Sequence, residues 1–551
     1  MGTPTVAGHV LDLLAGHGVT TAFGLPGTHN LALWRALDAD DATTGPRQRP
    51  RIVTVRHEQT AVHAADGQAR ATGGLGVALV TSGPGAANVL GAFGEAAAAR
   101  SPVLVVASDV PLTSRDPHRV RGLLHESADQ GALFAPLAKA VLQPHDAVSA
   151  AAAVELAAEL ALTAPRGPVY VGIPADVLGH PAPGPGQATA RPRREPTHVD
   201  ADHLTAAAEL LNAARRPLVW AGGGVVAADA CTALDALAWR IGAPVVTTYA
   251  GRGALPTGHP LLVDVPPHEP RVAALMAEAD ALLVLGSALD AMTTRGWSLP
   301  RPAHVIDVNV APSGELAPDV SLTADLTEVL DTLTLRLRAR KPWANAPFAL
   351  HDDVRREVRD DPRTSAAARL LDAVEQSWPD DGDVVCDMCI AGYWVGGYAT
   401  MPRPRRLAYP VGWGTLGFGL PAALGAATTG RSTLAVVGDG GLAMGVGELA
   451  TLVQEQLPVT VLLVDDGGYG MLRFTDGSAP APRQGLDLVA PDWLVLAGAY
   501  GVPAVEVSVN GLAEALAHAA AEAAARPGPR LVLWREALYP PRTTSPRWHA
   551  P

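Results

Sequence analysis

Short runs of almost exclusively apolar residues alternate with longer alanine-rich stretches over most of the 551-residue chain. A strand that is buried on both faces gives such an uninterrupted run, and a crossover helix separates it from the next parallel strand. The alternation therefore predicts βαβ units and doubly wound parallel sheets, which is an α/β fold. The predicted strands of the first block are residues 52–55, 77–80, 103–107 and 169–173.

The same alternation returns twice further along the chain. Because 551 residues exceed what one hydrophobic core normally includes, its return indicates separate domains. Whether the first and third blocks share one fold stays open from the pattern alone. The predicted strands of the second block are 218–221, 244–247, 281–285 and 304–308. Those of the third block are 384–386, 433–437, 459–464 and 530–534.

Proline-rich stretches separate these blocks. Residues 178–196 combine proline, glycine and arginine, a composition typical of a linker. A second connection is predicted at 341–353, which contains two prolines, Pro342 and Pro347, and the bulky Trp343. We therefore expect three doubly wound parallel-sheet domains, residues 1–178, 199–340 and 355–540, and a proline-rich tail without regular structure, 541–551.

Composition narrows the classes of function. A net charge of −13 argues against a nucleic-acid partner. Every apolar stretch of about 18 residues is interrupted by charges or breakers, so no membrane span is expected. The N-terminus lacks the layout of a signal peptide, and three cysteines are too few for a disulfide framework, which together favour a cytoplasmic location. Cys386 and Cys389 form a C-x-x-C pair, which we interpret as packing and turn residues.

Two acidic turns follow successive predicted strands of the third block. The first, GDGG at 438–441, contains Asp439, and the second, DDGG at 465–468, contains Asp466. Ligands of open parallel sheets bind at the carboxyl ends of the strands, and one crossover helix can bring two such turns together. Carboxylate oxygens beside glycine-rich turns suit a magnesium ion that holds a diphosphate. The sequence therefore predicts a magnesium and diphosphate site at this edge.

The segment that contains both turns resembles the cofactor-binding motif of the acetolactate synthase, benzoylformate decarboxylase and pyruvate decarboxylase family. Further segments of the first and third blocks match the same family. The resemblance covers nearly the whole chain and implies a pyrimidine-binding, a middle and a diphosphate-binding domain that hold thiamine diphosphate. The matching segments are GLPGTHNLALWRAL at 24–37, RHEQTAVHAADGQARATG at 56–73, LVTSGPGAANVLGAFGEA at 79–96, GWGTLGFGLPAALGAA at 412–427 and the stretch GDGGLAMGVGELATLVQEQLPVTVLLVDDGGYG.

The resemblance assigns roles to individual positions. Glu58 matches the glutamate that hydrogen-bonds a nitrogen of the aminopyrimidine ring, where a carboxylate stabilises the imino tautomer. Leu416 matches the aliphatic residue that bends the cofactor, and the Gly414 carbonyl would accept from its amino group. Asp439, Asp466 and the Gly468 carbonyl would bind the magnesium ion. Further cofactor contacts are implied for Pro26, Gly27, Gly83, Gly440, Gly441 and Tyr469.

One position departs from the family. Asp466 stands where the family usually has asparagine, and Asp465 also replaces an asparagine. Aspartate is still a hard oxygen ligand, so metal binding is expected to survive. The added negative charge would either weaken the affinity for a diphosphate or be offset by the metal.

Three polar residues are candidates for the substrate pocket. Thr28 matches the position that is Asp, Ser or Gly in the three named enzymes, and its hydroxyl could bind a substrate carboxylate; the alternative is a helix N-cap before 31–37. The adjacent His29 is either functional or a polar residue of the same cap. His125 lies in a stretch that resembles acetolactate synthase, which implies that it faces the thiazolium from the partner subunit.

Other positions restrict the choice within the family. Thr81 replaces the catalytic histidine of benzoylformate decarboxylase, and Leu472 replaces the pocket glutamate of pyruvate decarboxylase. The middle block lacks the arginine-rich flavin pattern of acetolactate synthase, so FAD is doubtful. Arg547 and Trp548 either close over the pocket or belong to a disordered tail. Three stretches are most similar to the 5-guanidino-2-oxopentanoate decarboxylase branch: ALLVLGSALD at 281–290, VVCDMCIAGYW at 384–394 and TTSPRW at 543–548.

The resemblance implies an enzyme that depends on thiamine diphosphate and magnesium and removes carbon dioxide from a 2-oxo acid without oxidation, through an enamine intermediate. An alternative is a carboligase of the acetolactate synthase type, which joins the enamine to an aldehyde or a second 2-oxo acid. A cofactor-binding homologue without catalysis is a further alternative. Glu58 and Asp439 come from opposite ends of the chain, and the resemblance implies a homodimer or homotetramer with active sites at the subunit interface.

Overall fold

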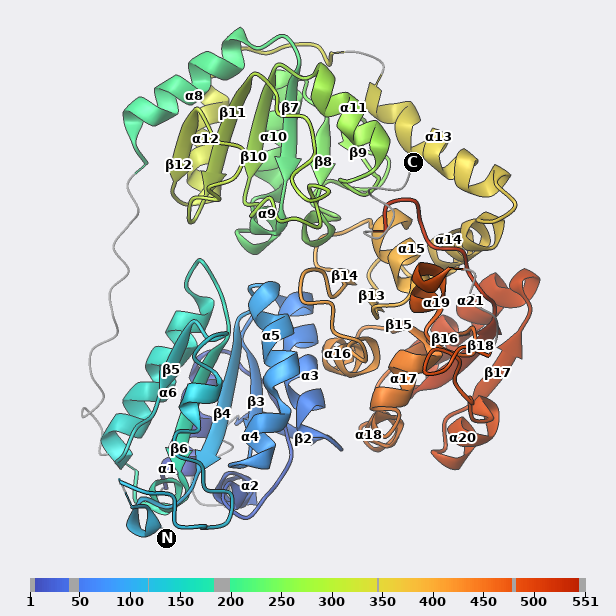
Figure 1. Ribbon diagram of the computed structural model, residues 1–551. Helices are drawn as coiled ribbons and strands as arrows, with labels where there is room; N and C mark the ends of the chain where they lie inside the picture. The colour runs from blue at the N-terminus through green and yellow to red at the C-terminus, as the bar shows by residue number, and fades with distance from the viewer. Residues whose placement is uncertain are drawn as a thin grey trace.

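Three parallel sheets of six strands each form the framework of the protein, and helices cover their faces (Figure 1). This confirms the predicted α/β fold of three doubly wound sheets. The predicted linker, residues 178–196, lies between the first two sheets, and most of it is outside the described residues. The computed structural model describes residues 5–38, 49–116, 118–182, 199–343, 346–477 and 482–544.

The first sheet has the strand order β2-β1-β3-β4-β6-β5. Its central strands β3 and β4 are buried at every position, which is why they read as continuous apolar runs. Its strands are β1 Thr21–Gly24, β2 Arg51–Thr54, β3 Gly76–Val80, β4 Val103–Asp109, β5 Ala140–Leu142 and β6 Val169–Pro174. Its helices are α1 Val6–Gly16, α2 Leu31–Asp38, α3 Glu58–Thr72, α4 Pro84–Asn88, α5 Leu90–Ala98, α6 Ala147–Leu162 and α7 Ala175–Gly179.

The middle sheet has the order β12-β11-β10-β7-β8-β9, in which the direction of strand succession reverses between β7 and β10. Its strands are β7 Pro217–Ala221, β8 Val245–Thr247, β9 Leu262–Val263, β10 Ala281–Leu285, β11 His304–Asn309 and β12 Val320–Thr323. The helices beside it are α8 Ala201–Ala213, α9 Gly223–Ala227, α10 Cys231–Ile241, α11 Pro270–Glu278 and α12 Leu326–Arg336.

The third sheet has the order β14-β13-β15-β16-β18-β17, which repeats the order of the first sheet strand for strand. The first and third blocks therefore share one topology. This answers the question, left open by the sequence pattern, of whether the two blocks are related folds. Its strands are β13 Asp383–Cys386, β14 Leu407–Ala408, β15 Thr433–Gly438, β16 Val459–Asp465, β17 Ala504–Val507 and β18 Arg530–Arg535. Its helices are α13 Ala346–Asp360, α14 Ser365–Ser377, α15 Ile390–Tyr398, α16 Gly419–Ala427, α17 Asp439–Gly445, α18 Glu448–Gln454, α19 Gly470–Asp476, α20 Trp493–Ala499 and α21 Leu512–Ala525.

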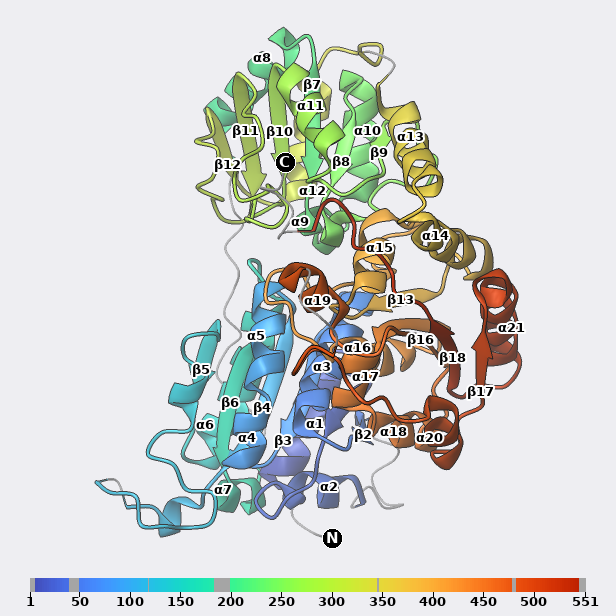
Figure 2. The ribbon, with the colours of Figure 1, turned by 45° about the vertical axis from the view of Figure 1, so that its right-hand side comes forward.

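Two corresponding helices, α3 of the first domain and α16 of the third, join these related domains (Figures 1 and 2). They cross so closely that each needs a glycine at the contact. A Cβ atom at Gly67 would lie 2.0 Å from the carbonyl oxygen of Ala422, and one at Gly425 would lie 1.8 Å from that of Ala64. These reciprocal contacts fix the two domains against each other without side chains between the helix backbones.

The structure corrects some sequence predictions. The predicted connection at 341–353 is largely helical, because α13 begins at Ala346 with Pro347 in its first turn, where proline is tolerated. The crossover helix expected between the two acidic turns is present as α18, and an additional helix, α17, precedes it and starts at Asp439 itself. The patterns missed β1, β5, β9, β12, β14 and β17, of which the longest has four residues. Within the described residues, no helix combines the length and apolarity that a bilayer crossing requires.

Candidate active site

The turn that follows β15 contains a buried carboxylate. Asp439 is the first residue of α17 and is 3% exposed, and its Oδ2 atom is buried without a hydrogen-bond partner among the described residues. Burial, and secondarily the charge of Asp466, raise the pKa of Asp439 to about 6. A buried carboxylate oxygen without a donor is costly unless a cation or a proton satisfies it.

The turn after β16 supplies a second carboxylate on the same edge. Burial raises the pKa of Asp466, while the nearby Arg473 acts in the opposite direction. Gly468 has φ +152°, and a Cβ atom there would lie 2.1 Å from the carbonyl oxygen of Leu486, so the turn requires glycine. Gly470 is similarly restricted, because its Cβ position would be 2.0 Å from Asp466 Oδ2. The tight turn therefore holds the Asp466 carboxylate in place.

These residues fit a divalent cation. Asp439 and Asp466 each have a raised pKa, and part of the shift at Asp439 comes from the charge of Asp466, so a positive ion between them would relieve the repulsion. The described residues contain no group of three or more His, Cys, Asp or Glu side chains arranged for a metal. A site here would therefore combine two carboxylates with a carbonyl, such as that of Gly468, and with oxygens of a bound ligand.

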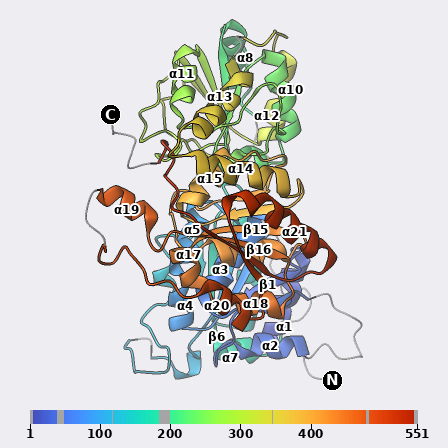
Figure 3. The same ribbon diagram turned by 90° about the vertical axis from the view of Figure 1, so that its right-hand side faces the viewer.

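Arg473, on α19, neutralises the added charge of Asp466. Its Nη1 atom lies 3.7 Å from Asp466 Oδ1 and donates a 2.7 Å hydrogen bond to the Asp466 carbonyl oxygen. It also donates to the Gly467 carbonyl and, over 2.6 Å, to Asp487 Oδ1. One guanidinium therefore balances the carboxylate and ties the turn to α19, the helix that stands out from the body in Figure 3.

Replacing Arg473 by glutamine is expected to destabilise the cofactor-free protein, because Asp439, Asp465 and Asp466 would then repel one another. Adding Asp466→Asn should recover part of this loss, with a coupling free energy on the order of 0.5–3 kcal/mol between the two positions. Thermal unfolding of the two single variants and the double variant measures that coupling. Asp487→Asn is the control, because it removes another partner of Arg473 outside the acidic pair; strictly additive effects of Arg473→Gln and Asp466→Asn would contradict the assignment.

The loop before α16 places the predicted cofactor-bending residue on this edge. Asp387, at the end of β13, accepts 3.1 Å hydrogen bonds from the Gly417 amide and one of 3.3 Å from the Gly419 amide. Burial raises its pKa to about 6. Leu416 is 37% exposed beside this anchor, and Gly414 has φ +75°, a conformation that favours glycine. The buried carboxylate thus determines the course of the loop that carries both predicted residues.

The other predicted glycines of the third domain lie where larger residues would collide. A Cβ atom at Gly441 would lie 2.7 Å from Asp387 Oδ2, and one at Gly440 would lie 2.7 Å from Cε1 of Tyr469. Tyr469 therefore packs directly on the turn that contains Asp439. Backbone amides without side chains above them can approach phosphate oxygens closely.

A buried glutamate of the first domain supports the same loop. Glu95, on α5, is fully buried, and its Oε2 atom accepts from the Thr415 amide (3.3 Å) and from Thr415 Oγ1 (3.2 Å). Its Oε1 atom lies 3.3 Å from Nη2 of Arg70, which also pairs with Asp66 at 2.6 Å. Burial raises the pKa of Glu95, and Arg70 opposes that rise. This charge cluster connects α3 and α5 to the loop before Leu416.

The equivalent edge of the first domain carries the other predicted residues. Glu58 is half-buried at the start of α3, and its Oε2 atom accepts a 3.0 Å hydrogen bond from Asn88 Nδ2. Thr81, at the end of β3, fills the space between Gly27 and Gly85, since a Cβ atom at either glycine would lie 2.7 Å from it. The turns after β1 and β3 are adjacent because these strands pair, and the order of strands reverses between them.

Both histidines predicted for the pocket meet one serine on this edge. His29 Nδ1 lies 2.6 Å from Ser82 Oγ, and the same oxygen lies 3.3 Å from His125 Nδ1. Thr28 and Pro26 are exposed at the mouth of the turn, while the fully buried Asn30 closes it by accepting from the Gly27 amide over 2.7 Å. The structure therefore gives less support to Thr28 as the N-cap of the following helix, because the side chain of Asn30 closes the turn before that helix.

Several residues that shape the two edges had no sequence signal. Ser82, Glu95 and Asp387 act across long sequence separations, whereas Arg473 anchors a turn that is close to it in sequence. Among the residues the sequence singled out, Cys389 is confirmed as a turn residue, because its Sγ atom caps α15 by accepting from the Gly392 amide. Arg547 and Trp548 lie outside the described residues.

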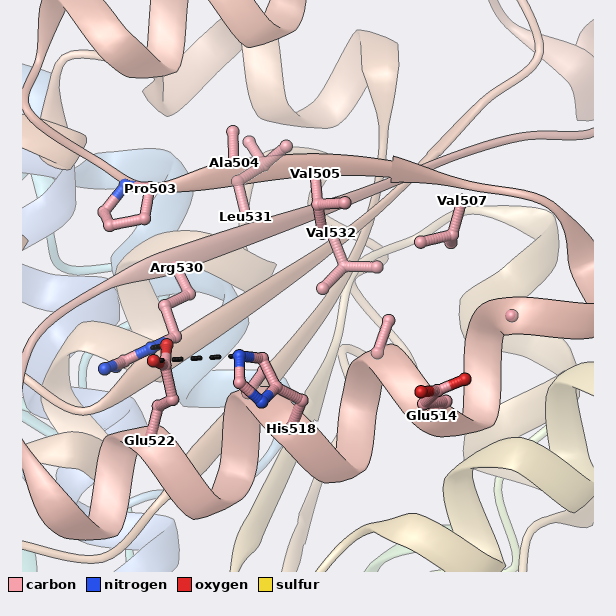
Figure 4. Close-up of a pocket in the computed structure, with 13 residues that line it drawn as sticks. Pro503, Ala504, Val505, Val507, Glu514, His518, Glu522, Arg530, Leu531 and Val532 are labelled. Atoms are coloured by element: carbon pink, nitrogen blue, oxygen red, sulfur yellow. Dashed lines mark hydrogen bonds and ion pairs between the residues drawn. The ribbon is translucent and has the colours of Figure 1, made fainter.

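The groove in Figure 4 is remote from this chemistry. It has a volume of about 490 Å³ and lies between α21 and the strands β17 and β18. Its lining is mainly aliphatic, with His518 and Glu522 on one side, and includes none of the predicted site residues. The candidate active site is therefore assigned to the carboxyl edges of the first and third sheets.

Family profiles match all three parts of the chain. The profile of the thiamine pyrophosphate enzyme N-terminal TPP binding domain matches residues 4–133, that of the central domain 204–333, and that of the C-terminal TPP binding domain 387–533. The chain belongs to the thiamine diphosphate-dependent enzymes. The two sheet edges described above thus lie in the two cofactor-binding domains of this family.

Relatives within the thiamine diphosphate family include different activities. The chain is 36% identical to the probable 2-ketoarginine decarboxylase AruI of Pseudomonas aeruginosa, over 91% of this chain and 89% of that protein. It is 29% identical to a probable acetolactate synthase large subunit of Methanocaldococcus jannaschii, over 90% and 86%. The 4-hydroxybenzoylformate decarboxylase of Rhodococcus jostii RHA1 shares the fold, with a TM-score of 0.80, 24% identity and coverage of 97% and 99%.

Proposed function

We propose that this thiamine diphosphate-dependent enzyme is a non-oxidative decarboxylase of a 2-oxo acid and that it requires magnesium. The observation that carries the magnesium requirement is the buried, unpartnered Oδ2 atom of Asp439 beside Asp466 on a glycine-rich edge. The 36% identity to a probable 2-ketoarginine decarboxylase supports decarboxylation as the reaction. Asp439, Asp466 and the Gly468 carbonyl would hold the ion, which would bind the diphosphate.

The proposed reaction breaks the bond between C1 and C2 of the 2-oxo acid, releases carbon dioxide and adds one proton to C2, so that an aldehyde results. When bound, thiamine diphosphate supplies the carbon nucleophile and accepts the electron pair of the broken bond. Glu58 would hold a proton at the pyrimidine ring, and Leu416 would set the shape of the cofactor. Thr28, His29 and His125 lie on the edge with Glu58, where they would orient the substrate and handle protons.

We propose that two copies of the chain complete each site. Glu58 belongs to the edge of the first sheet, whereas Asp439 belongs to the edge of the third. Large apolar side chains are exposed on the segments around both edges, which is typical of surfaces that a partner covers. A homodimer or homotetramer would bury them. These side chains are Val120, Leu124, Trp413, Leu416, Met444 and Leu472.

Carboligation is the second candidate, because relatives at 29–30% identity are acetolactate synthases. In that reaction C2 would bond to the carbonyl carbon of an aldehyde or a second 2-oxo acid instead of a proton. The outcome depends on how quickly the proton reaches C2 relative to the second carbonyl compound.

Carbon dioxide release tests the proposal. Protein supplied with thiamine diphosphate and magnesium is expected to release carbon dioxide from at least one of pyruvate, benzoylformate and 5-guanidino-2-oxopentanoate, with aldehyde in equal amount. Mass spectrometry of reactions that contain mixed 2-oxo acids and aldehydes would identify a ligated product instead. Absence of release from every acid, with cofactor shown to be bound, would refute a decarboxylase for these substrates and favour the non-catalytic alternative.

A further inference from the structure

Ser82 occupies a central position on the edge of the first sheet. It is fully buried two residues after the end of β3, and its hydroxyl lies between the Nδ1 atoms of His29 and His125 at 2.6 and 3.3 Å. The two imidazole rings stand edge to face, with centroids 5.5 Å apart and an interplanar angle of 79°. Both rings therefore turn the same nitrogen toward one oxygen.

The number of hydrogens on this oxygen restricts the two rings. A serine hydroxyl donates one hydrogen bond, so it can satisfy only one bare Nδ1 atom. The other Nδ1 atom must then carry a hydrogen and donate it to Ser82. If both Nδ1 atoms donated, the hydroxyl hydrogen would have no acceptor, because Ser82 Oγ has no third partner among the described residues. When both rings are neutral, one is therefore the Nδ1–H tautomer with a bare Nε2 atom, and the other is the Nε2–H tautomer. These states exchange when one proton moves through the hydroxyl from one Nδ1 atom to the other, the ring that gains it loses a proton from Nε2 to water, and the other ring takes one from water at Nε2.

We propose that Ser82 joins His29 and His125 into one proton relay that supplies the proton consumed in the decarboxylation. This rests on the proposed function. The relay donates a proton from Nε2 of one ring to C2 of the substrate. Ser82 passes a proton to the Nδ1 atom of that ring and takes one from the Nδ1 atom of the other. The second ring then binds a proton from water at its Nε2 atom, so one solvent proton enters for each proton delivered.

The surrounding backbone holds the relay in position. Gly83 has φ +60°, and a Cβ atom there would lie 2.7 Å from Cβ of His125. His125 itself has φ +66°, which is uncommon for a residue with a side chain and is often found at functional sites. Gln130 accepts from the Gly83 amide over 2.6 Å and donates to the hydroxyl of Tyr170 over 2.7 Å. The fixed backbone keeps both nitrogens directed at Ser82.

Charges around the relay favour a neutral His29. Burial lowers its pKa, His125 lowers it further, and Asp109 at the end of β4 opposes both effects. Asp109 is itself paired with Arg115 at 3.2 Å, which weakens its influence. Glu126, next to His125, accepts hydrogen bonds from the amides of residues 121 and 123. A pair of rings that is not fully protonated is the state in which a relay can transfer protons.

Nitrogen chemical shifts of histidine-labelled, cofactor-free protein test the relay without any turnover. At a pH where both rings are neutral, His29 and His125 are expected to show opposite tautomers, or exchange between two opposite pairs. Ser82→Ala should abolish this opposition. Ser108→Ala is the matched control, because Ser108 is a buried serine of the same domain whose hydroxyl has no hydrogen-bond partner among the described residues. Identical tautomers in the wild type, or no change in Ser82→Ala, would overturn the proposal.

Product analysis tests the role in catalysis separately. Ser82→Ala is expected to release carbon dioxide in the first turnover but to form aldehyde about 10²-fold more slowly, because general acid catalysis by the relay is lost. Added aldehyde should then divert product toward a hydroxyketone. Ser108→Ala should behave like the wild type. Unchanged aldehyde formation in Ser82→Ala would contradict the relay, whereas a wild type that releases no carbon dioxide would refute only the proposed function, since the tautomer experiment still decides the relay.

Discussion

Replacing Glu58 by glutamine is expected to reduce turnover by roughly 10²–10⁴-fold while thiamine diphosphate still binds. The amide has the shape of the carboxylate and can keep the contact with Asn88 Nδ2 through its oxygen. It cannot hold an exchangeable proton at the pyrimidine ring. The rate of carbon dioxide release and the calorimetric affinity for the cofactor, measured on the same preparation, separate these two effects.

Glu455→Gln is the matched control for this variant. Glu455 pairs with Arg51 at 2.7 Å across the contact between the first and third domains, but it lies outside both sheet edges. The same change of charge at that position should leave turnover nearly unchanged. Turnover of Glu58→Gln at the level of the wild type would refute the role assigned to Glu58.

Replacing Asp439 by alanine is expected to remove magnesium-dependent binding of thiamine diphosphate. The change deletes one of the two carboxylates of the proposed metal site, and loss of a direct ligand should cost more than the roughly 10–100-fold that follows from loss of an outer-shell partner. Calorimetric titration of thiamine diphosphate with and without magnesium measures the effect.

Asp466→Asn provides the comparison for Asp439→Ala. An amide oxygen still binds magnesium, and removal of one carboxylate relieves the repulsion with Asp439, so cofactor binding should persist. If both variants bound thiamine diphosphate as the wild type does, the metal site would lie elsewhere.

Most of the strands that the sequence predicted have both faces buried, although β2 is partly exposed and the missed β1 is buried. β3, β4, β10 and β16 are buried at every position, so their apolar runs identify them without further information. The missed strands are short, and β17 lies at the edge of its sheet with two exposed residues out of four. Such strands owe their existence to pairing with a neighbour, which local patterns do not encode.

The residues of the candidate site also fall into those that the sequence could predict and those that it could not. Residues inside glycine-rich turns, such as Asp439 and Gly468, could be predicted because the turn and the carboxylate are adjacent in sequence. Glu95 contacts Thr415 across 320 positions, and Ser82 contacts His125 across 43. A single serine or glutamate in a helix-rich sequence has no feature that reveals such a partner, so only the folded chain could identify it.

The crossing of α3 and α16 has a consequence for how the enzyme can change. At Gly67 and Gly425 the two backbones are in direct contact, so a larger residue at either position would displace the two half-sites of the chain relative to each other. The contact between α3 and α16 thus fixes the distance between the two half-sites within one chain. The β4–β5 connection and α19 lie outside this crossing. Selection for another substrate can therefore change these segments without altering the contact between α3 and α16.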